Sequence, residues 1–181
     1  MEDLSLHILD IAENSLAAGA NRIEIYIRES DDQLVLEVRD NGSGMDEELL
    51  KMVSDPFFTT KTVRKVGLGI PLLKQAAEEC GGELTIHSEK GKGTIITAKF
   101  RRSHIDLKPM GDIGATIMVL IAGNPDIDIV LEYNKEGKIY RFNTEELRAD
   151  LEGMPINLPA LLGIIKEEIN KGIRNIKGGG K

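Results

Sequence analysis

The chain has 181 residues, of which 41% are hydrophobic, and a formal net charge of -7 at pH 7. This length and composition can bury one large core or two small ones, which excludes a disordered or fibrous protein, and the acidic balance argues against nucleic acid as a partner. The single cysteine, Cys80, excludes an internal disulfide and a multi-cysteine zinc site. No terminal apolar run resembles a signal peptide, and the longest apolar stretch, residues 117–122, is too short to span a bilayer, so we expect a cytoplasmic protein without a membrane partner.

The first hundred residues predict helices layered on a mixed sheet. Helical spacing of apolar residues begins near Asp3, and period-two alternation follows at Ile23, Ile25 and Ile27, so that a helix precedes a strand. The predicted helices cover residues 3–18, 46 onward and 68–79, and the predicted strands cover residues 23–27, 34–38, 83–88 and 94–100. The expected fold class is α/β, in the form of a two-layer α+β sandwich.

The remaining residues predict a small second α/β region. It contains an apolar helix, a hairpin, a short helix and a final helix, at residues 112–122, 127–133 with 138–142, 143 onward and 157–173. Asn143 and Asn157 are the predicted caps of the last two helices. We therefore divide the chain into a first domain at residues 1–102, a small region at residues 103–177 and a disordered tail at residues 178–181.

The segment Asp40-Asn41-Gly42-Ser43-Gly44-Met45 follows a strand-like run and is the hardest part of the chain to explain without a ligand. An Asp followed by two alternating glycines places a fixed hydrogen-bond acceptor beside backbone that can adopt positive φ and approach a flat guest closely. Adenine is such a guest, because its exocyclic amine needs an acceptor. The alternative is an ordinary turn between two strands.

Three more segments accompany this one in a characteristic order and spacing. The four segments cover residues 6–20, 40–45, 55–61 leading into 67–70, and 81–94. Together they resemble the Asn, Phe and glycine boxes of the GHKL superfamily, which includes gyrase-type topoisomerases, heat-shock chaperones, histidine kinases and MutL mismatch-repair proteins. The resemblance covers roughly residues 3–100. It implies a Bergerat-type ATP-binding fold, with helices on one face of a mixed sheet, and ATP and Mg²⁺ as cofactors.

The resemblance also implies roles for individual residues. Asn14 matches the Mg²⁺ ligand, and Asp10 matches the place where ATP-hydrolysing members carry a Glu as general base. Here that catalytic carboxylate is shorter by one methylene, which limits its reach. His7 shares their helix face and is expected to make a structural hydrogen bond. The implied ATP-binding residues are Asn14, Asp40, Gly42, Gly44, Met45, Phe57, Lys61, Gly67, Leu68, Gly69 and Thr94.

The function implied by the resemblance is Mg-dependent ATP binding in a regulatory system. ATP would serve phosphotransfer to an unidentified partner protein or slow hydrolysis, which makes the chain a GHKL-type ATPase or protein kinase. The alternative is a non-catalytic ATP-sensing module whose nucleotide shapes a partner-binding surface.

The role of residues 103–177 is left open by their sequence. The final predicted helix carries apolar residues at partly helical spacing, namely Leu161, Leu162, Ile164, Ile165, Ile169 and Ile173. They predict either a surface for a partner or a homodimer, or burial within the region itself. We expect a chain truncated after Phe100 to keep nucleotide binding.

Overall fold

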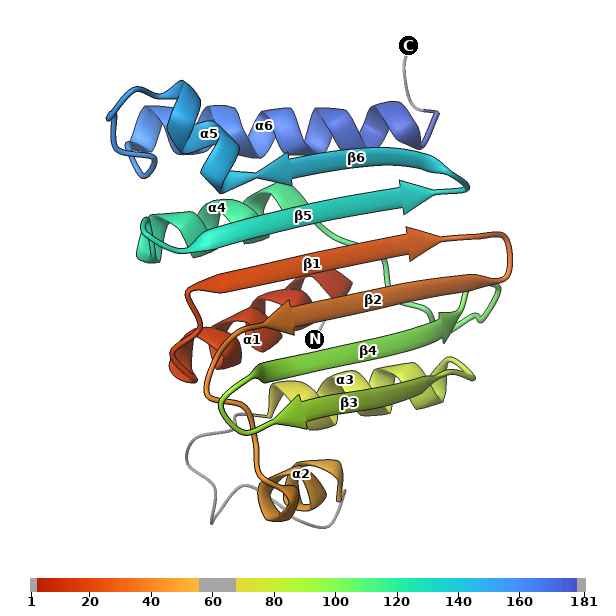
Figure 1. Cartoon of the computed structure of the whole chain (residues 1–181). Coiled ribbons are helices and arrows are strands. Elements are labelled where there is room, and N and C mark those ends of the chain that lie inside the picture. Colours follow the sequence, from red (N-terminus) through yellow and green to blue (C-terminus); the bar gives the residue numbers. More distant parts are fainter. Residues whose placement is uncertain (1–2, 56–67, 179–181) are drawn as a thin grey trace.

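A six-stranded sheet organises the computed structural model, which describes residues 3–55 and 68–178 (Figure 1). Its strand order is β3-β4-β2-β1-β5-β6. The strands are β1 (Arg22–Glu29), β2 (Gln33–Asp40), β3 (Glu83–Glu89), β4 (Gly93–Arg101), β5 (Asp128–Lys135) and β6 (Lys138–Asn143). The helices of the described part are α1 (Leu4–Ala17), α2 (Glu47–Ser54), α3 (Gly69–Glu79), α4 (Ile113–Gly123), α5 (Thr144–Asp150) and α6 (Pro159–Ile176). This mixed sheet with helices packed on it confirms the expected fold class.

The alternation of the two first strands places the core on one face of the sheet. Ile23, Ile25 and Ile27 of β1 are each at most 1% exposed and point toward the helices, whereas the residues between them face the other side. Figure 1 shows α1, α3 and α4 behind the sheet. The helix layer therefore covers the apolar face, as the period-two pattern predicted.

The sheet continues across the proposed boundary at residue 102. β5 pairs with β1 in parallel along eight residues, from Arg22 opposite Asp128 to Glu29 opposite Lys135, and β6 then adds to β5. A parallel neighbour needs a long crossover, which the segment with α4 provides. Residues 103–177 therefore extend the first sheet. The division after residue 102 stays a prediction about function, because the hydrogen-bonded sheet shows no break there.

Side chains cap four of the helices of the described part, α1, α2, α4 and α5. The predicted cap of α6 is wrong. Asn143 caps α5, since its side chain accepts a hydrogen bond from the backbone N–H of Glu145. Asn157 does not cap α6. That helix begins at Pro159, so the N-cap position falls on Leu158, whose side chain has no acceptor.

The start of α1 is tied to the segment that leads into α4. Pro109 and Met110 accept hydrogen bonds from the N–H groups of Leu4 and Ser5 at 2.9 and 2.8 Å. The buried hydroxyl of Thr116 in α4 donates to the Ser5 carbonyl at 3.2 Å. The second region thus fixes the position of the helix that carries Asp10 and Asn14. No helix of the described residues has both the length and the apolar character needed to cross a membrane.

These contacts argue against the expectation that a chain truncated after Phe100 keeps nucleotide binding. We predict that a chain ending at residue 102 loses cooperative unfolding, because β1 loses its parallel neighbour and α1 loses the cover of α4. The truncation also removes Ile117, which is fully buried. Replacing a buried Ile by Ala alone lowers the free energy of unfolding by about 2–5 kcal/mol, a large part of the about 5–15 kcal/mol of a typical domain. Thermal denaturation followed by circular dichroism measures this. Deletion of residues 179–181 is the control, and a truncated chain that melts like the full chain would contradict the prediction.

Candidate functional site

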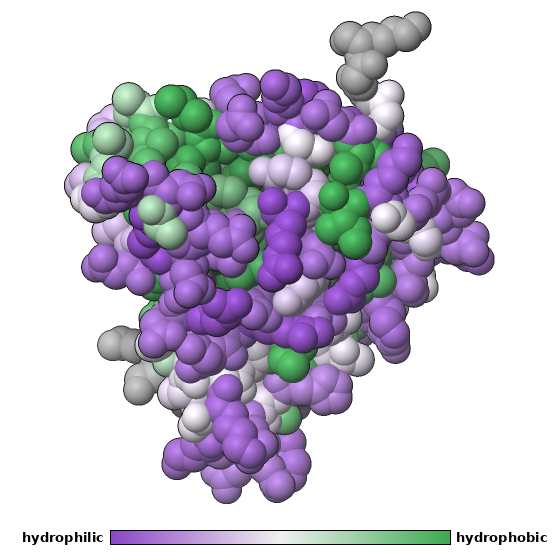
Figure 2. Space-filling model, turned by 45° about the horizontal axis from the view of Figure 1, so that its top comes forward, coloured by the Kyte–Doolittle hydropathy of each residue, from purple (hydrophilic) through white to green (hydrophobic). Residues whose placement is uncertain are grey.

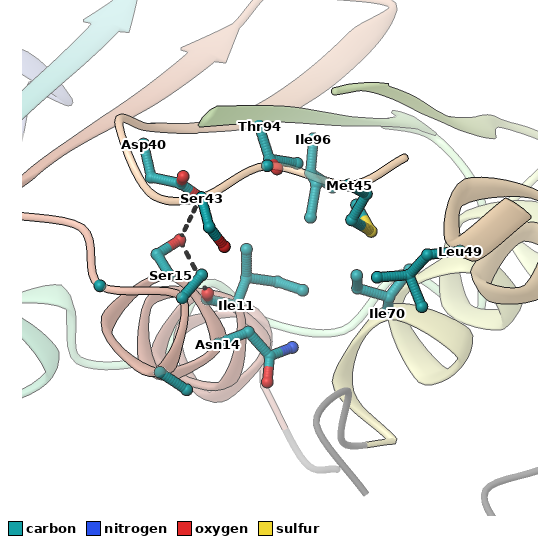
Figure 3. Close-up of a pocket in the computed structure, with 14 residues that line it drawn as sticks. Ile11, Asn14, Ser15, Asp40, Ser43, Met45, Leu49, Ile70, Thr94 and Ile96 are labelled. Atoms are coloured by element: carbon teal, nitrogen blue, oxygen red, sulfur yellow. Dashed lines mark hydrogen bonds between the residues drawn. The ribbon is translucent and has the colours of Figure 1, made fainter. Parts of the chain in front are cut away.

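A pocket of about 580 Å³ opens between α1, the segment after β2, α2, the start of α3 and β4 (Figure 3). It is lined by Ile11, Asn14, Ser15, Ala17, Ala18, Gly19, Asp40, Ser43, Gly44, Met45, Leu49, Ile70, Thr94 and Ile96. The volume is typical of a small-molecule site, and so is the mixture of apolar walls with a few polar groups. Of the residues implied by the resemblance, the structure brings Asn14, Asp40, Gly44, Met45 and Thr94 together here.

The Asp40 carboxylate is held from two sides. The Ser15 hydroxyl donates to Oδ2 at 2.6 Å, and the Gly42 N–H donates to Oδ1 at 2.9 Å. Ser15 is 3% exposed, and its Oγ also lies 3.2 Å from the Ile11 carbonyl of its own helix. Because both bonds go to a charged acceptor, they are short and directional. The carboxylate is therefore fixed at the pocket wall.

Sequence reasoning did not select Ser15 as a site residue. Its position next to Asn14 was visible, but a serine in a helix commonly bonds the carbonyl four residues earlier, as this one does with Ile11. Only the packing of α1 against the end of β2 shows that the same hydroxyl reaches Asp40.

The two glycines after Asp40 are needed by the protein itself. Gly44 has a φ of +67°, and a Cβ there would overlap the Glu89 carbonyl. A Cβ on Gly42 would lie 3.0 Å from the Ala18 carbonyl oxygen and 3.1 Å from Asp40 Oδ1. Gly42 is buried beside the pocket without lining it. The sequence suggested that these glycines let the backbone approach a ligand closely. In the structure they let it approach the protein itself, at the end of α1 and at the end of β3.

Beside Asp40, the pocket wall continues onto β4 and is tied to β3. Thr94 lies across from Asp40 in the antiparallel pair of β2 and β4, and its hydroxyl is 2.8 Å from that of Ser88. Ser88 Oγ also accepts from the Met45 N–H at 2.8 Å. This network holds the backbone of Met45, so that its side chain lies in the pocket (Figure 3).

A second polar region lies where α3 begins against α1. A Cβ on Gly69 would lie 3.0 Å from Asp10 Cβ and 3.7 Å from Asn14 Nδ2, so glycine permits this approach. Asn14 Nδ2 is buried and has no hydrogen-bond partner among the described residues. Leu68, at the N-cap of α3, offers no capping side chain, and the first turn carries no acidic residue. In the first turn of α3, Gly69 and Ile70 have an N–H and Pro71 has none, so two backbone donors begin the helix beside the buried amide, which suits an anion or oxygen-rich ligand.

His7 lies one turn before Asp10 and is 3% exposed. Its Nδ1 has no hydrogen-bond partner among residues 3–55 and 68–178, so the structural bond expected of His7 is not made by that atom there. Burial lowers the pKa of the imidazole, which is therefore neutral at pH 7.

Three expected site residues, Phe57, Lys61 and Gly67, lie outside the described residues. Leu68 and Gly69 are described but do not line the pocket. Within the described part of the chain no cluster of three or more His, Cys, Asp or Glu side chains could hold a metal ion.

Residues 2–104 match the family model of histidine kinase-, DNA gyrase B-, and HSP90-like ATPases. The chain belongs to this family. Membership implies ATP binding, and the six-stranded mixed sheet with helices agrees with the Bergerat-type fold of the family. The pocket described above lies within the matched residues.

Histidine kinases and other sensor kinases are among the relatives of this ATPase-family chain. Sporulation kinase E of Bacillus subtilis is 36% identical over 97 residues, which are 53% of this chain and 13% of the relative. Sporulation kinase C of Bacillus subtilis is 44% identical over 62 residues, 34% of this chain and 14% of the relative. Sensor kinase CckA of Brucella abortus is 38% identical over 84 residues, 46% of this chain and 9% of the relative. The chain thus spans less than a fifth of each of these relatives.

Proposed function

We propose that this protein is an ATP-binding regulatory protein that uses Mg-ATP for phosphotransfer to a partner protein or for slow hydrolysis. The observation that carries the proposal is the Asp40 carboxylate, fixed by Ser15 and Gly42 at the wall of a pocket of about 580 Å³. A fixed acceptor beside apolar walls suits the exocyclic amine and flat face of adenine. Thr94, Met45 and Gly44 complete that end of the proposed site.

The triphosphate would extend from Asp40 toward the start of α3. There Gly69 lets the helix approach α1, and the N–H groups of Gly69 and Ile70, which precede Pro71, favour negative charge. Asn14 is the proposed Mg²⁺ ligand, because an amide oxygen is a hard neutral donor and the buried amide has an atom without a partner. The orientation of an amide can be exchanged by a flip, which would present the oxygen. The bound ion supplies charge neutralisation to the phosphates.

The parts of this proposal that involve Phe57, Lys61, Gly67 and Leu68 depend on the family resemblance. Lys61 would add positive charge near the phosphates, and Gly67 would leave room for them. Phosphoryl transfer needs mainly positioning and electrostatic stabilisation, so the site requires no covalent nucleophile of its own.

Asp10 is the proposed catalytic base. It lies next to Gly69 and one turn before Asn14, at the phosphate end of the proposed site. A base must come within hydrogen-bond reach of a water or hydroxyl, and an Asp reaches less far than a Glu. That short reach is also the observation favouring the second candidate, a non-catalytic ATP-sensing module that presents a surface to a partner.

We predict that Asp40→Asn abolishes ATP binding, because an amide presents a donor toward the adenine amine. ATP at about a hundredfold above its Kd should stabilise the wild-type protein by about 2.7 kcal/mol, and the variant should show no thermal shift. Ser15→Ala removes only one of the two bonds that fix Asp40 and should weaken binding by about tenfold. Asp150→Asn, an exposed change on α5, is the matched control. A wild-type ATP shift retained in Asp40→Asn would contradict the adenine assignment.

We predict that Asn14→Ala removes the dependence of ATP affinity on Mg²⁺ while ADP still binds weakly through its adenine end. The substitution deletes the proposed amide ligand and leaves Asp40 unchanged. Isothermal titration with ATP, with and without Mg²⁺, measures this. If Mg²⁺ strengthens ATP binding equally in the variant and the wild type, Asn14 is not the ligand.

We predict that Asp10→Asn keeps nucleotide affinity and slows ATP turnover by about 10²- to 10⁴-fold, the usual effect of removing a positioned base. Asp10→Glu should raise the rate of water attack, because it restores the reach of a Glu. Single-turnover hydrolysis is the measurement, and Glu13→Gln, an exposed neighbour on α1, is the matched control. Equal, measurable hydrolysis in wild type and Asp10→Asn would remove Asp10 from the mechanism, and no wild-type turnover at all would favour the sensing module.

A further inference from the structure

The outer edge of the sheet, at β6, is not paired by the described part of the chain. The two residues between β5 and β6, at 136–137, have positive φ, which is typical of a two-residue hairpin turn. Lys135 and Lys138, which flank this turn, are the closing hydrogen-bonded pair, and such pairs alternate along an antiparallel ladder. The N–H and C=O groups of Ile139 and Arg141 therefore point away from β5. No other backbone hydrogen bond of the described residues reaches these groups.

α6 covers the core face of β6 and leaves the other face open. Gly172 of α6 lies so close to the Tyr140 ring that a Cβ on this glycine would overlap the ring. Tyr140 is opposite the buried Tyr133 of β5, so its side chain is on the face toward the core. Ile139 and Arg141 alternate with Tyr140 and lie on the other face, where Ile139 is 55% exposed and Arg141 is also exposed. Figure 2, in which this side of the molecule is turned forward, shows mainly hydrophilic side chains, with apolar side chains in separate areas.

β6 carries two positive charges that are not paired. Lys138 and Arg141 are both exposed, and the strand contains no carboxylate. Among residues 3–55 and 68–178, neither side chain makes an ion pair at 4.0 Å or less, although Glu132 of β5 lies opposite Arg141 in the register. The chain as a whole has a net charge of -7, so this edge differs in sign from the rest of the protein and favours a negatively charged partner.

The other edge of the sheet, at β3, is different. Its acidic side chains are paired within the protein, since Glu83 lies 3.1 Å from Lys99 and Glu89 lies 2.7 Å from Lys92. Ser88 of the same strand belongs to the hydrogen-bond network that holds the pocket wall. β3 therefore serves the nucleotide pocket and has its charges matched, whereas the charges of β6 are left for a partner.

We propose that β6 accepts an extended, acidic segment of a partner protein as a seventh strand of the sheet. The outward N–H and C=O groups of Ile139 and Arg141 would bond the backbone of that segment. Lys138 and Arg141 lie on opposite faces of β6, so a carboxylate on either face of the added strand would meet a cation. A second copy of this chain would place two basic edges side by side, and like charges on edge strands oppose such pairing. The interaction goes beyond the proposed function, since β6 lies outside the nucleotide pocket and the added strand needs no ATP.

The test uses the full chain and a fluorescein-labelled peptide of about eight residues in which Val and Glu alternate. One comparison peptide has Lys in place of every Glu. Another has Pro in place of every Val, which keeps the charge but prevents pairing as a strand. We expect the Val-Glu peptide to bind at least about tenfold more tightly than either comparison peptide by fluorescence anisotropy. No binding of the Val-Glu peptide, or equal binding of a comparison peptide, overturns the proposal.

A proline variant tests the contact through the backbone. Ile139→Pro removes one outward N–H and leaves the bonds to β5 in place, and its ring occupies the position of the added strand. It should weaken binding of the Val-Glu peptide by about tenfold or more, whereas Ile139→Thr changes the same side chain, keeps the N–H and should not. Equal binding by the two variants overturns the proposal. Cooperative thermal unfolding by circular dichroism, as in the wild type, shows that both variants fold.

The charges and the competing occupant are tested separately. Lys138→Gln with Arg141→Gln should weaken binding of the Val-Glu peptide and reduce its salt dependence. Lys90→Gln with Lys108→Gln, which changes two exposed lysines elsewhere on the chain, is the control with equal charge change. Unchanged binding in the first pair, or an equal loss in the control pair, overturns the proposal. A wild-type dimer in sedimentation velocity that Ile139→Pro dissociates would assign the edge to a second copy and would also overturn it.

Discussion

The hydrogen bond from Ser15 Oγ to Asp40 Oδ2, at 2.6 Å, joins the helix and the strand on which the whole pocket depends. It fixes the carboxylate on one wall and the end of α1 on the other. The neighbouring bond from the Ser43 N–H to the Ala18 carbonyl, at 2.9 Å, closes the same corner through the backbone. Because Asn14 precedes Ser15 on α1, the two ends of the proposed ATP site are positioned by a single helix.

The other end of α1 is positioned by residues beyond the family match. Thr116 bonds the Ser5 carbonyl, and β5 extends the sheet from β1. At the far end of β1, the buried Tyr133 hydroxyl donates to Glu29 at 2.6 Å, and Lys177 at the end of α6 lies over the Tyr133 ring. Burial raises the pKa of Tyr133, so it stays a donor in this bond. The C-terminal segment thus completes the core against which the ATPase-family fold packs.

The pocket and the C-terminal segment occupy different parts of one sheet. The pocket opens where β2 ends, whereas β5 and β6, with α4 and α6 packed beside them, form the other side of the sheet (Figure 1). α1 contacts α4, which contacts α6, so packed helices connect the two.

The sequence by itself determined the helices and strands, since periodicity reports which residues of an element are buried, as Ile23, Ile25 and Ile27 show. It also selected Asp40, Asn14 and Thr94, which line the pocket, because their types and spacing follow a family pattern. Only the tertiary structure decided that β5 pairs with β1, that Ser15 reaches Asp40 and that the uncapped start of α3 lies beside Asn14. The physical reason is that periodicity shows which face of an element is buried but not which other element packs against that face. Strand partners and contacts between distant segments are selected by how the complete set of apolar faces packs together.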